Sequence, residues 1–399
     1  MTSPGRPLTR RALIGAGGGA LALSALAACS PRGGEGMAVS TAAGAPTAER
    51  ASGLEAAFDE AFTASGLAGC AVRVRLPNGA LWLRTAGVAD LDTEEPYRSG
   101  DFVRIASITK TFTATAVLRM VDERLLALED TLDRWYPQVP NAKEITLEQM
   151  LGMRSGIADF TADARFDDRF AADPAMPWSL EQTLQVILRN PPEFAPGAEV
   201  QYCDSNYALL GAIAARVDGA SLAEVLTRRV IGPAGLLNTY YPADDEIGSP
   251  HPQGYVPTVT SAGAIDPAVP PTVVNEVNPA VPAGAGALIS TLDDVSAWGD
   301  VLADGRLLGP LTQARRLQTQ RFEGQKLDFG YGLGITNFNE YLGHDGAIFG
   351  FSSVVLTRPE TGTQIAMAGN TSTNSTTPTL SIAVALIDEI DPSQGTSAG

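Results

Sequence analysis

The stretch that decides the fold reads IASITKTFTA and spans residues 105–114. It holds a Ser-x-x-Lys pattern at Ser107 and Lys110, in a chain with only three lysines. Positions three apart share one face of a helix, so Lys110 is expected to lie beside the Ser107 hydroxyl. A serine hydroxyl is a weak nucleophile that a neighbouring base or cation activates. The pattern therefore predicts a nucleophilic serine at a helix start, and the alternative is an ordinary first helical turn.

Two further polar stretches lie downstream. The first holds Tyr202 and Asp204, just before an apolar run that is expected to be helical. A tyrosine near a lysine can serve as a general base, although a buried core tyrosine is the alternative. The second reads GHDGA over residues 343–347. Glycine before a strand lets a substrate approach a sheet edge, whereas an Asp-Gly pair is also typical of a plain β-turn.

These three stretches, in this order and spacing, resemble the serine β-lactamase and penicillin-binding protein superfamily. Its signatures are Ser-x-x-Lys, Tyr-x-Asn, and Lys-Thr-Gly or His-x-Gly. The resemblance covers about residues 53–390 and is strongest to class C β-lactamases, D-alanyl-D-alanine carboxypeptidases and related esterases. It implies an α+β fold, in which an antiparallel β-sheet is flanked by N- and C-terminal helices and carries an inserted, mostly helical subdomain. Alternating residues predict two β-hairpins, over residues 70–87 and 349–368, and apolar periods predict helices that include 180–189 and 221–230. The order of the expected helices and strands along the chain agrees with such layers.

The resemblance also implies a role for each matching residue. Ser107 would be acylated, and Lys110 would lower the proton affinity of its neighbours. Tyr202 would take the serine proton and hand it to the leaving group. The backbone N–H groups of Ser107 and Ala347 would form an oxyanion hole.

Two positions depart from the family pattern. Asp204 replaces an asparagine, and a carboxylate only accepts hydrogen bonds. It could pair with Lys110, which would leave Tyr202 as the base, but β-lactam hydrolysis would suffer; a register shift to Asn206 is the alternative. His344 replaces a lysine and is mostly uncharged near neutral pH, so its grip on a substrate carboxylate would be weaker. Asp204, His344 and Gly346 are predicted to contact substrate.

The N-terminus has the pattern of an export signal. The pair Arg10 and Arg11 precedes an apolar run that ends in Leu-Ala-Ala-Cys at Cys29, which resembles a twin-arginine lipoprotein signal over residues 1–28. Its removal would change the formal charge from −17 to −20, which argues against nucleic-acid binding. The sequence thus predicts a protein exported to the bacterial envelope and anchored by lipid at Cys29 to the outer face of the membrane.

The rest of the chain is predicted to form one hydrolase domain. A flexible tether over 29–52 leads to an α/β part, 53–130 with 285–390, and a helical part, 131–284; a tail follows over 391–399. Cys70 and Cys203 could form a disulfide, but two cysteines are too few for a disulfide framework that holds the fold together. The two histidines have no metal-binding spacing, so neither a metal nor a cofactor is expected.

The predicted function is hydrolysis through an acyl-enzyme on Ser107, most of all as a D-alanyl-D-alanine carboxypeptidase. The substrate would be a small molecule or peptide, namely acyl-D-Ala-D-Ala, an ester or a β-lactam. A carboxylic esterase or a β-lactamase of the same fold is one alternative. A non-catalytic, penicillin-binding or wall-sensing lipoprotein is another.

Overall fold

The computed structural model describes residues 44–258, 265–266, 268–322, 329–372 and 377–392. The predicted signal peptide, Cys29 and the start of the tether lie outside the described residues. Within these ranges, none of the helices combines the length and the apolar character that crossing a bilayer requires.

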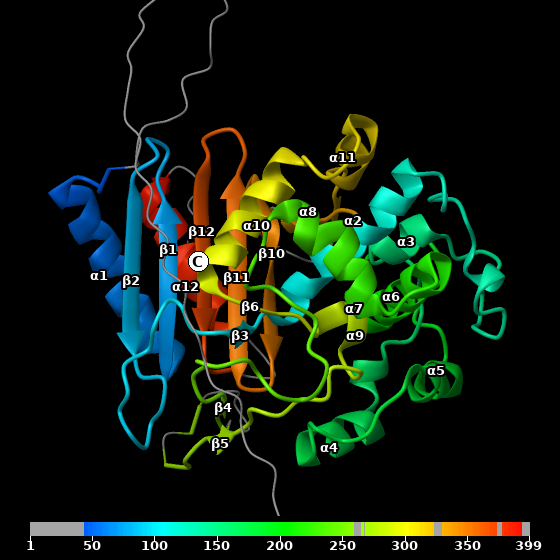
Figure 1. Cartoon of the computed structure of the whole chain (residues 1–399), viewed down its shortest axis with the longest axis horizontal. Helices are drawn as coiled ribbons and strands as arrows, with labels where there is room; N and C mark the ends of the chain where they lie inside the picture. Colours follow the sequence, from blue (N-terminus) through cyan, green and yellow to red (C-terminus); the bar gives the residue numbers. More distant parts are fainter. Residues whose placement is uncertain (1–43, 259–264, 267, 323–328, 373–376, 393–399) are drawn as a thin grey trace, which may run out of the picture. The chain divides into compact units, whose positions relative to one another are not determined.

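An antiparallel eight-stranded sheet forms the centre of the fold, in the order β2-β1-β12-β11-β10-β9-β8-β7 (Figure 1). The two hairpins expected from the sequence are present as β1 with β2 and β11 with β12. The strands are β1 Gly69–Arg75, β2 Leu81–Gly87, β7 Gln320–Arg321, β8 Phe329–Tyr331, β9 Thr336–Phe338, β10 Tyr341–Ile348, β11 Phe351–Arg358 and β12 Thr363–Gly369.

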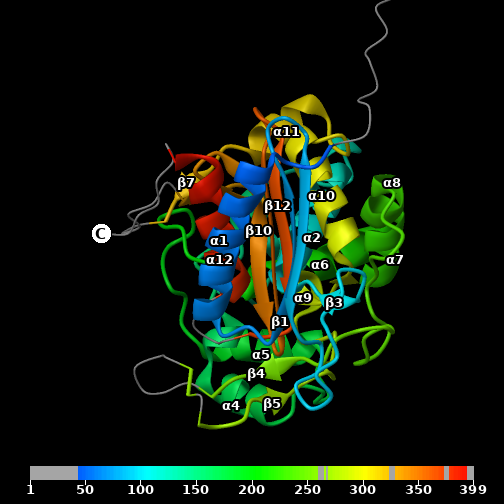
Figure 2. The ribbon, with the colours of Figure 1, turned by 90° about the vertical axis from the view of Figure 1, so that its left-hand side faces the viewer.

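Helices from both ends of the chain cover one face of this sheet. α1 (Ala48–Ser65) and α12 (Pro378–Ile390) lie side by side (Figure 2). Leu54 and Phe58 of α1 are buried in one cluster with Leu386 of α12 and strand residues such as Val72. Burial of such large apolar side chains stabilises the layer by about 1.5–3 kcal/mol each. The predicted antiparallel sheet with flanking terminal helices is therefore confirmed.

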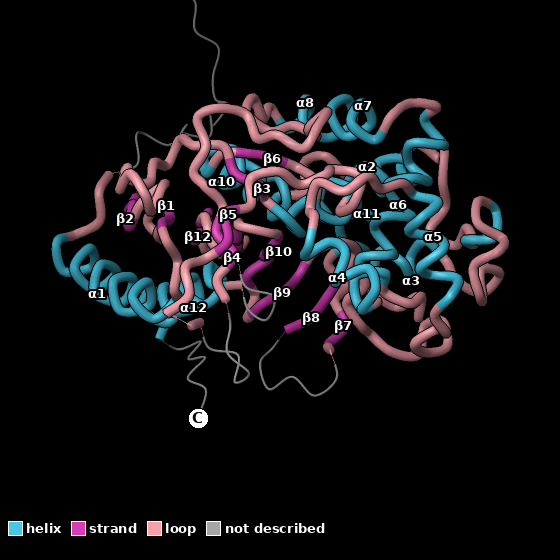
Figure 3. The backbone as a smooth tube through the Cα atoms, turned by 90° about the horizontal axis from the view of Figure 1, so that it is seen from below, coloured by secondary structure: helices cyan, strands magenta, loops and turns pink. Residues whose placement is uncertain are grey.

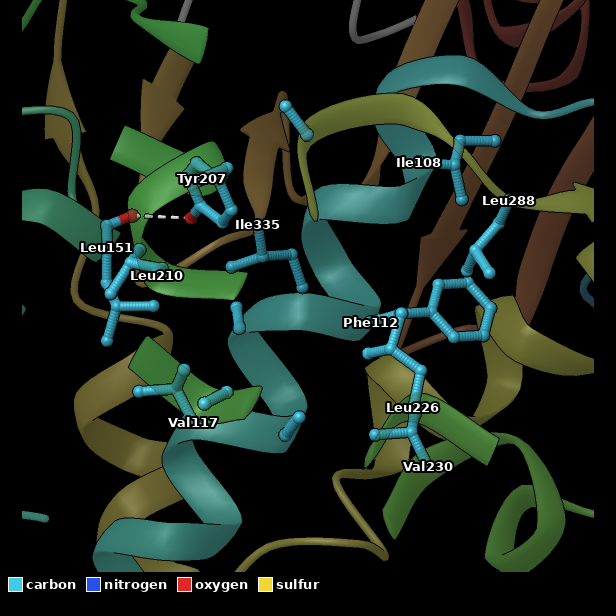
Figure 4. Close-up of a cluster of buried hydrophobic side chains, with 14 of the residues drawn as sticks. Ile108, Phe112, Val117, Leu151, Tyr207, Leu210, Leu226, Val230, Leu288 and Ile335 are labelled. Atoms are coloured by element: carbon cyan, nitrogen blue, oxygen red, sulfur yellow. Dashed lines mark hydrogen bonds between the residues drawn. The ribbon is translucent and has the colours of Figure 1, made fainter. Parts of the chain in front are cut away.

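The opposite face packs against α10 (Leu292–Asp304), and α2 (Thr109–Asp122) lies in the same buried cluster. Nearly every residue of α2 is buried, so the helix runs through the interior. Phe112 stacks on Trp298 with ring centroids 3.9 Å apart, and the Trp298 indole donates to Thr111 Oγ1 at 2.6 Å. Figure 4 shows the same core, in which Tyr207 donates to the Leu151 carbonyl at 2.8 Å. The helix is rich in threonine, and hydrogen bonds to its side chains offset the cost of burying their hydroxyl groups.

The remaining helices gather beside the far strands of the sheet, away from α1 (Figure 3). They are α3 Leu147–Leu151, α4 Ala164–Ala172, α5 Leu180–Arg189, α6 Asp204–Asp218, α7 Leu222–Leu226, α8 Gly232–Ala234, α9 Ala283–Gly286 and α11 Pro310–Arg316. Two small strand pairs lie outside the main sheet: β3 Val103–Arg104 with β6 Ile289–Ser290, and β4 Tyr255–Val256 with β5 Thr272–Val273. The helix expected over 221–230 is divided into α7 and a π-helical turn, Thr227–Ile231.

Candidate active site

Ser107 lies in a tight 3₁₀ turn, Ala106–Ile108, directly before α2. The preceding residue, Ala106, has a φ of +47°, a left-handed conformation that L-residues seldom adopt. Such local strain is found where the surrounding structure holds a functional residue in position. Ser107 Oγ accepts a hydrogen bond from Lys110 Nζ at 2.9 Å, so the i, i+3 pair lies as the spacing predicts.

Lys110 is fully buried and uses its whole donor capacity. Its Nζ contacts Ser107 Oγ at 2.9 Å, the Ala285 carbonyl at 2.8 Å and Asp204 Oδ1 at 2.6 Å. A buried ammonium is costly unless a counter-charge and hydrogen bonds compensate for lost hydration. The contact with Asp204, which the sequence suggested, and the two hydrogen bonds therefore compensate for the burial of the Lys110 side chain.

Tyr202 completes the polar cluster around the serine. Its hydroxyl shares a side-chain hydrogen bond with Ser107, and Lys110 Nζ lies 4.8 Å from its ring centroid. Burial raises the pKa of Tyr202 well above its usual value, the negative charge of Asp204 raises it further, and the Ser107 hydrogen bond opposes the shift. At neutral pH, Tyr202 is therefore a neutral phenol and not a phenolate.

The structure decides which residue of the 202–206 stretch faces the site. Asp204, the first residue of α6, is 24% exposed and pairs with Lys110. Asn206 is buried, accepts from Ser155 Oγ at 2.6 Å and approaches a methionine sulfur. The register alternative therefore fails, and an acceptor-only carboxylate occupies the motif position.

A second carboxylate next to Asp204 was not anticipated. Asp159 Oδ2 accepts the Asp204 backbone N–H at 3.2 Å, and Thr161 Oγ1 lies 3.0 Å from Asp159 Oδ1 and 3.3 Å from Asp204 Oδ2. Burial and the charge of Asp204 raise the pKa of Asp159 to about 6. No motif marked Asp159 or Thr161, because their role depends on a contact across more than forty residues of sequence.

Gly346 brings β10 against the serine turn. A Cβ placed on Gly346 would lie 2.7 Å from the Ser107 backbone nitrogen and 2.8 Å from the Ile105 carbonyl, so only glycine fits. The next residue, Ala347, is thereby placed beside Ser107. The alternative reading of residues 343–347 as a β-turn is wrong, since they lie inside β10 and pair with β11.

His344 is turned into the protein and has little contact with solvent. It is 2% exposed, its Nε2 lies 3.1 Å from Tyr331 Oη, and its Nδ1 lies 2.5 Å from the Asp345 carbonyl. Burial lowers the pKa of His344 to about 4, while the charge of Asp345 opposes the shift. His344 is thus neutral with both ring nitrogens engaged, and it supplies no charge for a substrate carboxylate.

Two cavities meet at the serine, and Ser107 and Ala347 line both of them. The larger, about 550 Å³, is bounded mainly by apolar side chains, among them Phe160, Phe166, Phe170, Val281, Ile348 and Phe349. The smaller, about 270 Å³, is bounded by Tyr202, Phe329, Tyr331, Thr336, His344, Asp345, Gly346 and Thr377. A cleft of this total size is suited to a small-molecule or short-peptide substrate.

The structure also shows where the two cysteines and the second histidine lie. Cys70 and Cys203 are both buried and free, so no disulfide joins them. Within the described part of the chain, no group of three or more His, Cys, Asp or Glu side chains could hold a metal ion. His251 Nδ1 lies 2.9 Å from the carbonyl of its neighbour Pro252, in a loop outside both cavities.

Comparisons with known proteins concern the chain and its fold as a whole. A family model described as Beta-lactamase matches residues 54–389. Esterase EstB of Burkholderia gladioli is 28% identical over 278 residues, which cover 64% of this chain and 70% of the esterase. Penicillin-binding protein 4* of Bacillus subtilis is 24% identical and covers 69% of this chain and 62% of its own length. A D-stereospecific amidohydrolase from Streptomyces sp. superposes with a TM-score of 0.75 at 26% identity, covering 86% of this chain and 98% of its own.

Proposed function

Because the chain belongs to the beta-lactamase family and is a hydrolase of that fold, we propose that it hydrolyses esters or amides through an acyl-enzyme on Ser107. The observation that carries the proposal is the contact of Ser107 Oγ with Lys110 Nζ at 2.9 Å, inside an otherwise buried polar cluster. A fixed cation beside a serine oxygen favours the developing alkoxide.

The hydrogen-bond pattern indicates the route of the proton. All three Lys110 donors are engaged, so Ser107 Oγ accepts from the lysine and its own proton points toward Tyr202. As Ser107 Oγ attacks the carbonyl carbon, its proton passes to the Tyr202 oxygen. Tyr202 releases its own proton to the departing alcohol or amine, so the phenol is neutral before and after the step. The raised pKa of Tyr202 suits this relay better than a preformed phenolate.

The carbonyl oxygen gains negative charge during the attack. The backbone N–H groups of Ser107 and Ala347 would bind this charge, and the position of both residues in the lining of both cavities supports that role. In the second half of the reaction a water molecule attacks the acyl carbon, giving up one proton through Tyr202 to Ser107 Oγ. The products are a carboxylic acid and the free serine.

We further propose that the leaving group is uncharged or cationic. Among the described residues, the smaller cavity contains the Asp345 carboxylate and a neutral His344, and no lysine or arginine lines it. A terminal carboxylate, as in acyl-D-Ala-D-Ala or a β-lactam, would therefore meet repulsion. The carboxypeptidase predicted from the sequence remains the second candidate, and the similarity to penicillin-binding protein 4* favours it.

Hydrolysis of p-nitrophenyl acetate by the full chain, with intact-protein mass spectrometry, tests the proposal. Ser107→Ala should lower turnover at least about a thousandfold and prevent a covalent adduct with a fluorophosphonate, which phosphonylates activated serines with loss of fluoride. Ser372→Ala is the matched control, because its hydroxyl lines the same cavity but accepts from Gly350 N–H; its adduct should form. Unchanged turnover in Ser107→Ala would overturn the proposal, and a stable benzylpenicillin adduct would favour the carboxypeptidase.

We also propose that the protein is exported and anchored to the membrane by lipid at Cys29. The support is the Leu-Ala-Ala-Cys motif after a paired arginine and an apolar run. Cys29→Ala should move the protein from the membrane fraction to the soluble fraction, and an unchanged distribution would count against the anchor.

A further inference from the structure

The two cavities at Ser107 differ in chemistry, and Tyr202 lines only the smaller one. This asymmetry indicates which half of a substrate each cavity would hold. Tyr202 protonates the leaving group, so the leaving group must lie on the Tyr202 side of the scissile bond. The acyl group then lies on the other side of Ala347, in the larger cavity.

An aromatic wall, made of Phe160, Phe166, Phe170 and Phe349, borders the larger cavity. Phe166 and Phe170 are four residues apart on α4 and therefore share one face of the helix. Phe166 meets Phe160 edge to face with ring centroids 5.0 Å apart. Phe170 meets Phe349 with centroids 4.6 Å apart, which joins α4 to the turn between β10 and β11. This arrangement presents several ring surfaces within one cavity of about 550 Å³.

We propose that the larger cavity is the acyl subsite and that it selects a bulky, apolar, preferably aromatic acyl group. The inference rests on the proposed function, because it needs the acyl-enzyme on Ser107. Burial of apolar surface against the aromatic wall contributes binding energy that an acetyl group cannot obtain. An aromatic acyl group also gains edge-to-face contacts of the kind that the wall residues make with one another.

The charges around the cavity narrow the substrate class further. Its charged lining residues in the described part of the chain are Asp167 and Asp204, and Asp204 already pairs with Lys110. No lysine or arginine of the described ranges lines this cavity, so an acyl group that carries a carboxylate would find no counter-charge among them. The substrate class is therefore esters or amides of uncharged aromatic or branched carboxylic acids.

The test compares p-nitrophenyl phenylacetate with p-nitrophenyl acetate, which share the leaving group and differ only in the acyl group. The native full chain should show a kcat/KM for phenylacetate at least tenfold above that for acetate. Phe349→Ala, at a partly exposed turn position, should lower this ratio about tenfold while acetate turnover changes less than threefold. Phe170→Leu, which keeps an apolar residue at this position of the aromatic wall, is the second variant and should lower the ratio by a smaller factor.

Phe329→Ala is the matched control, since Phe329 lines only the smaller cavity. It should leave the acyl ratio unchanged and alter the dependence on the leaving group. If the ratio of kcat/KM for the two esters is unchanged in both Phe349→Ala and Phe170→Leu, while acetate hydrolysis still depends on Ser107, the acyl-subsite inference is overturned and the proposed function is not. A ratio that responds to Phe329→Ala instead would reverse the assignment of the cavities. Acetate hydrolysis that does not depend on Ser107 would overturn the proposed function itself.

Discussion

The two cavities that meet at Ser107 are built from different kinds of structure. Strands β8, β9 and β10 form much of the smaller one, and hydrogen bonds fix their side chains: Thr336 Oγ1 donates to the Gly343 carbonyl at 2.8 Å, and Tyr331 contacts His344 at 3.1 Å. The larger cavity is bordered by the short helix α4 and by the turn at Phe349. The aromatic rings of these two elements are held by packing against one another. Strand pairing thus positions the backbone of Gly346 and Ala347 beside Ser107, whereas side-chain packing shapes the space for the acyl group.

This difference divides the expected effects of mutation into two kinds. A change on the strand side should lower the turnover of acetate and phenylacetate esters by a similar factor, because these esters share the leaving group and differ only in the acyl group. A change on the aromatic side should alter the order of substrates, because it affects contacts that only some acyl groups make.

The largest effect is expected for Gly346→Ala. The added Cβ would lie 2.7 Å from the Ser107 backbone nitrogen, so β10 must move away from the serine turn. The two oxyanion donors would separate, and kcat/KM should fall about 10²- to 10³-fold for acetate and phenylacetate esters alike. Gly100→Ala is the control, since a Cβ there meets nothing within 4 Å. A loss confined to one of the two substrates would break the division.

The sequence predicted those parts of the site that are local in the chain. Ser107 and Lys110 lie three residues apart at a helix start, so helical geometry alone brings them together. The α5 helix begins after its cap Ser179 and ends at Arg189, as its apolar period indicates. Both hairpins follow from alternating residues around a turn.

Long-range contacts decided the features that the sequence could not predict. Asp345 and Gly346 lie within a strand because β11 and the Ser107 backbone surround them, which outweighs the turn preference of Asp-Gly. The burial of His344 depends on Tyr331 from another strand. The aromatic wall joins Phe160 to Phe349 across nearly half of the chain, and no local period marks such a set.

An intermediate effect is expected for Asp204→Asn, because Asp204 borders the larger cavity yet pairs with Lys110. The negative charge of Asp204 contributes to the raised pKa of Tyr202, so its removal should lower that pKa. The limb of the pH profile of kcat/KM that reports the ionisation of Tyr202 should therefore move to lower pH. An amide can also donate to a substrate carbonyl, so acylation by benzylpenicillin should rise about tenfold.

The control for that shift is Asp167→Asn. This exposed carboxylate lines the same cavity but is not the partner of Lys110, so its removal should leave the limb in place. Equal shifts in both variants would mean that the general acidity of the cavity, and not the ion pair, sets the profile.

The smallest effect is expected at the base of the aromatic wall. Asp163 caps α4 by accepting from the Arg165 and Phe166 backbone at 3.0 and 3.1 Å, and it pairs with Arg189 of α5. The Arg189 hydrogen bonds, opposed by burial, lower the pKa of Asp163 from its usual 3.8. Asp163→Asn keeps a capping oxygen but loses the ion pair, which should cost about 1–2 kcal/mol at pH 7.

The pH dependence of that cost identifies its origin. A depressed folded-state pKa gives stability that is present above the unfolded value of 3.8 and is lost as the pH falls through the folded value. The difference in unfolding free energy between native protein and Asp163→Asn should therefore shrink as the pH falls below 4, as followed by urea unfolding. Asp168→Asn, which changes an exposed carboxylate on the same helix, should show no such trend.

The Asp163→Asn variant also tests the role of α4 in activity. If α4 only shapes the acyl cavity, Asp163→Asn should lower the ratio of kcat/KM for phenylacetate to that for acetate two- to threefold and leave acetate turnover unchanged. An equal loss on both esters would show that α4 also supports the reacting groups, and the division between the two cavities would then fail.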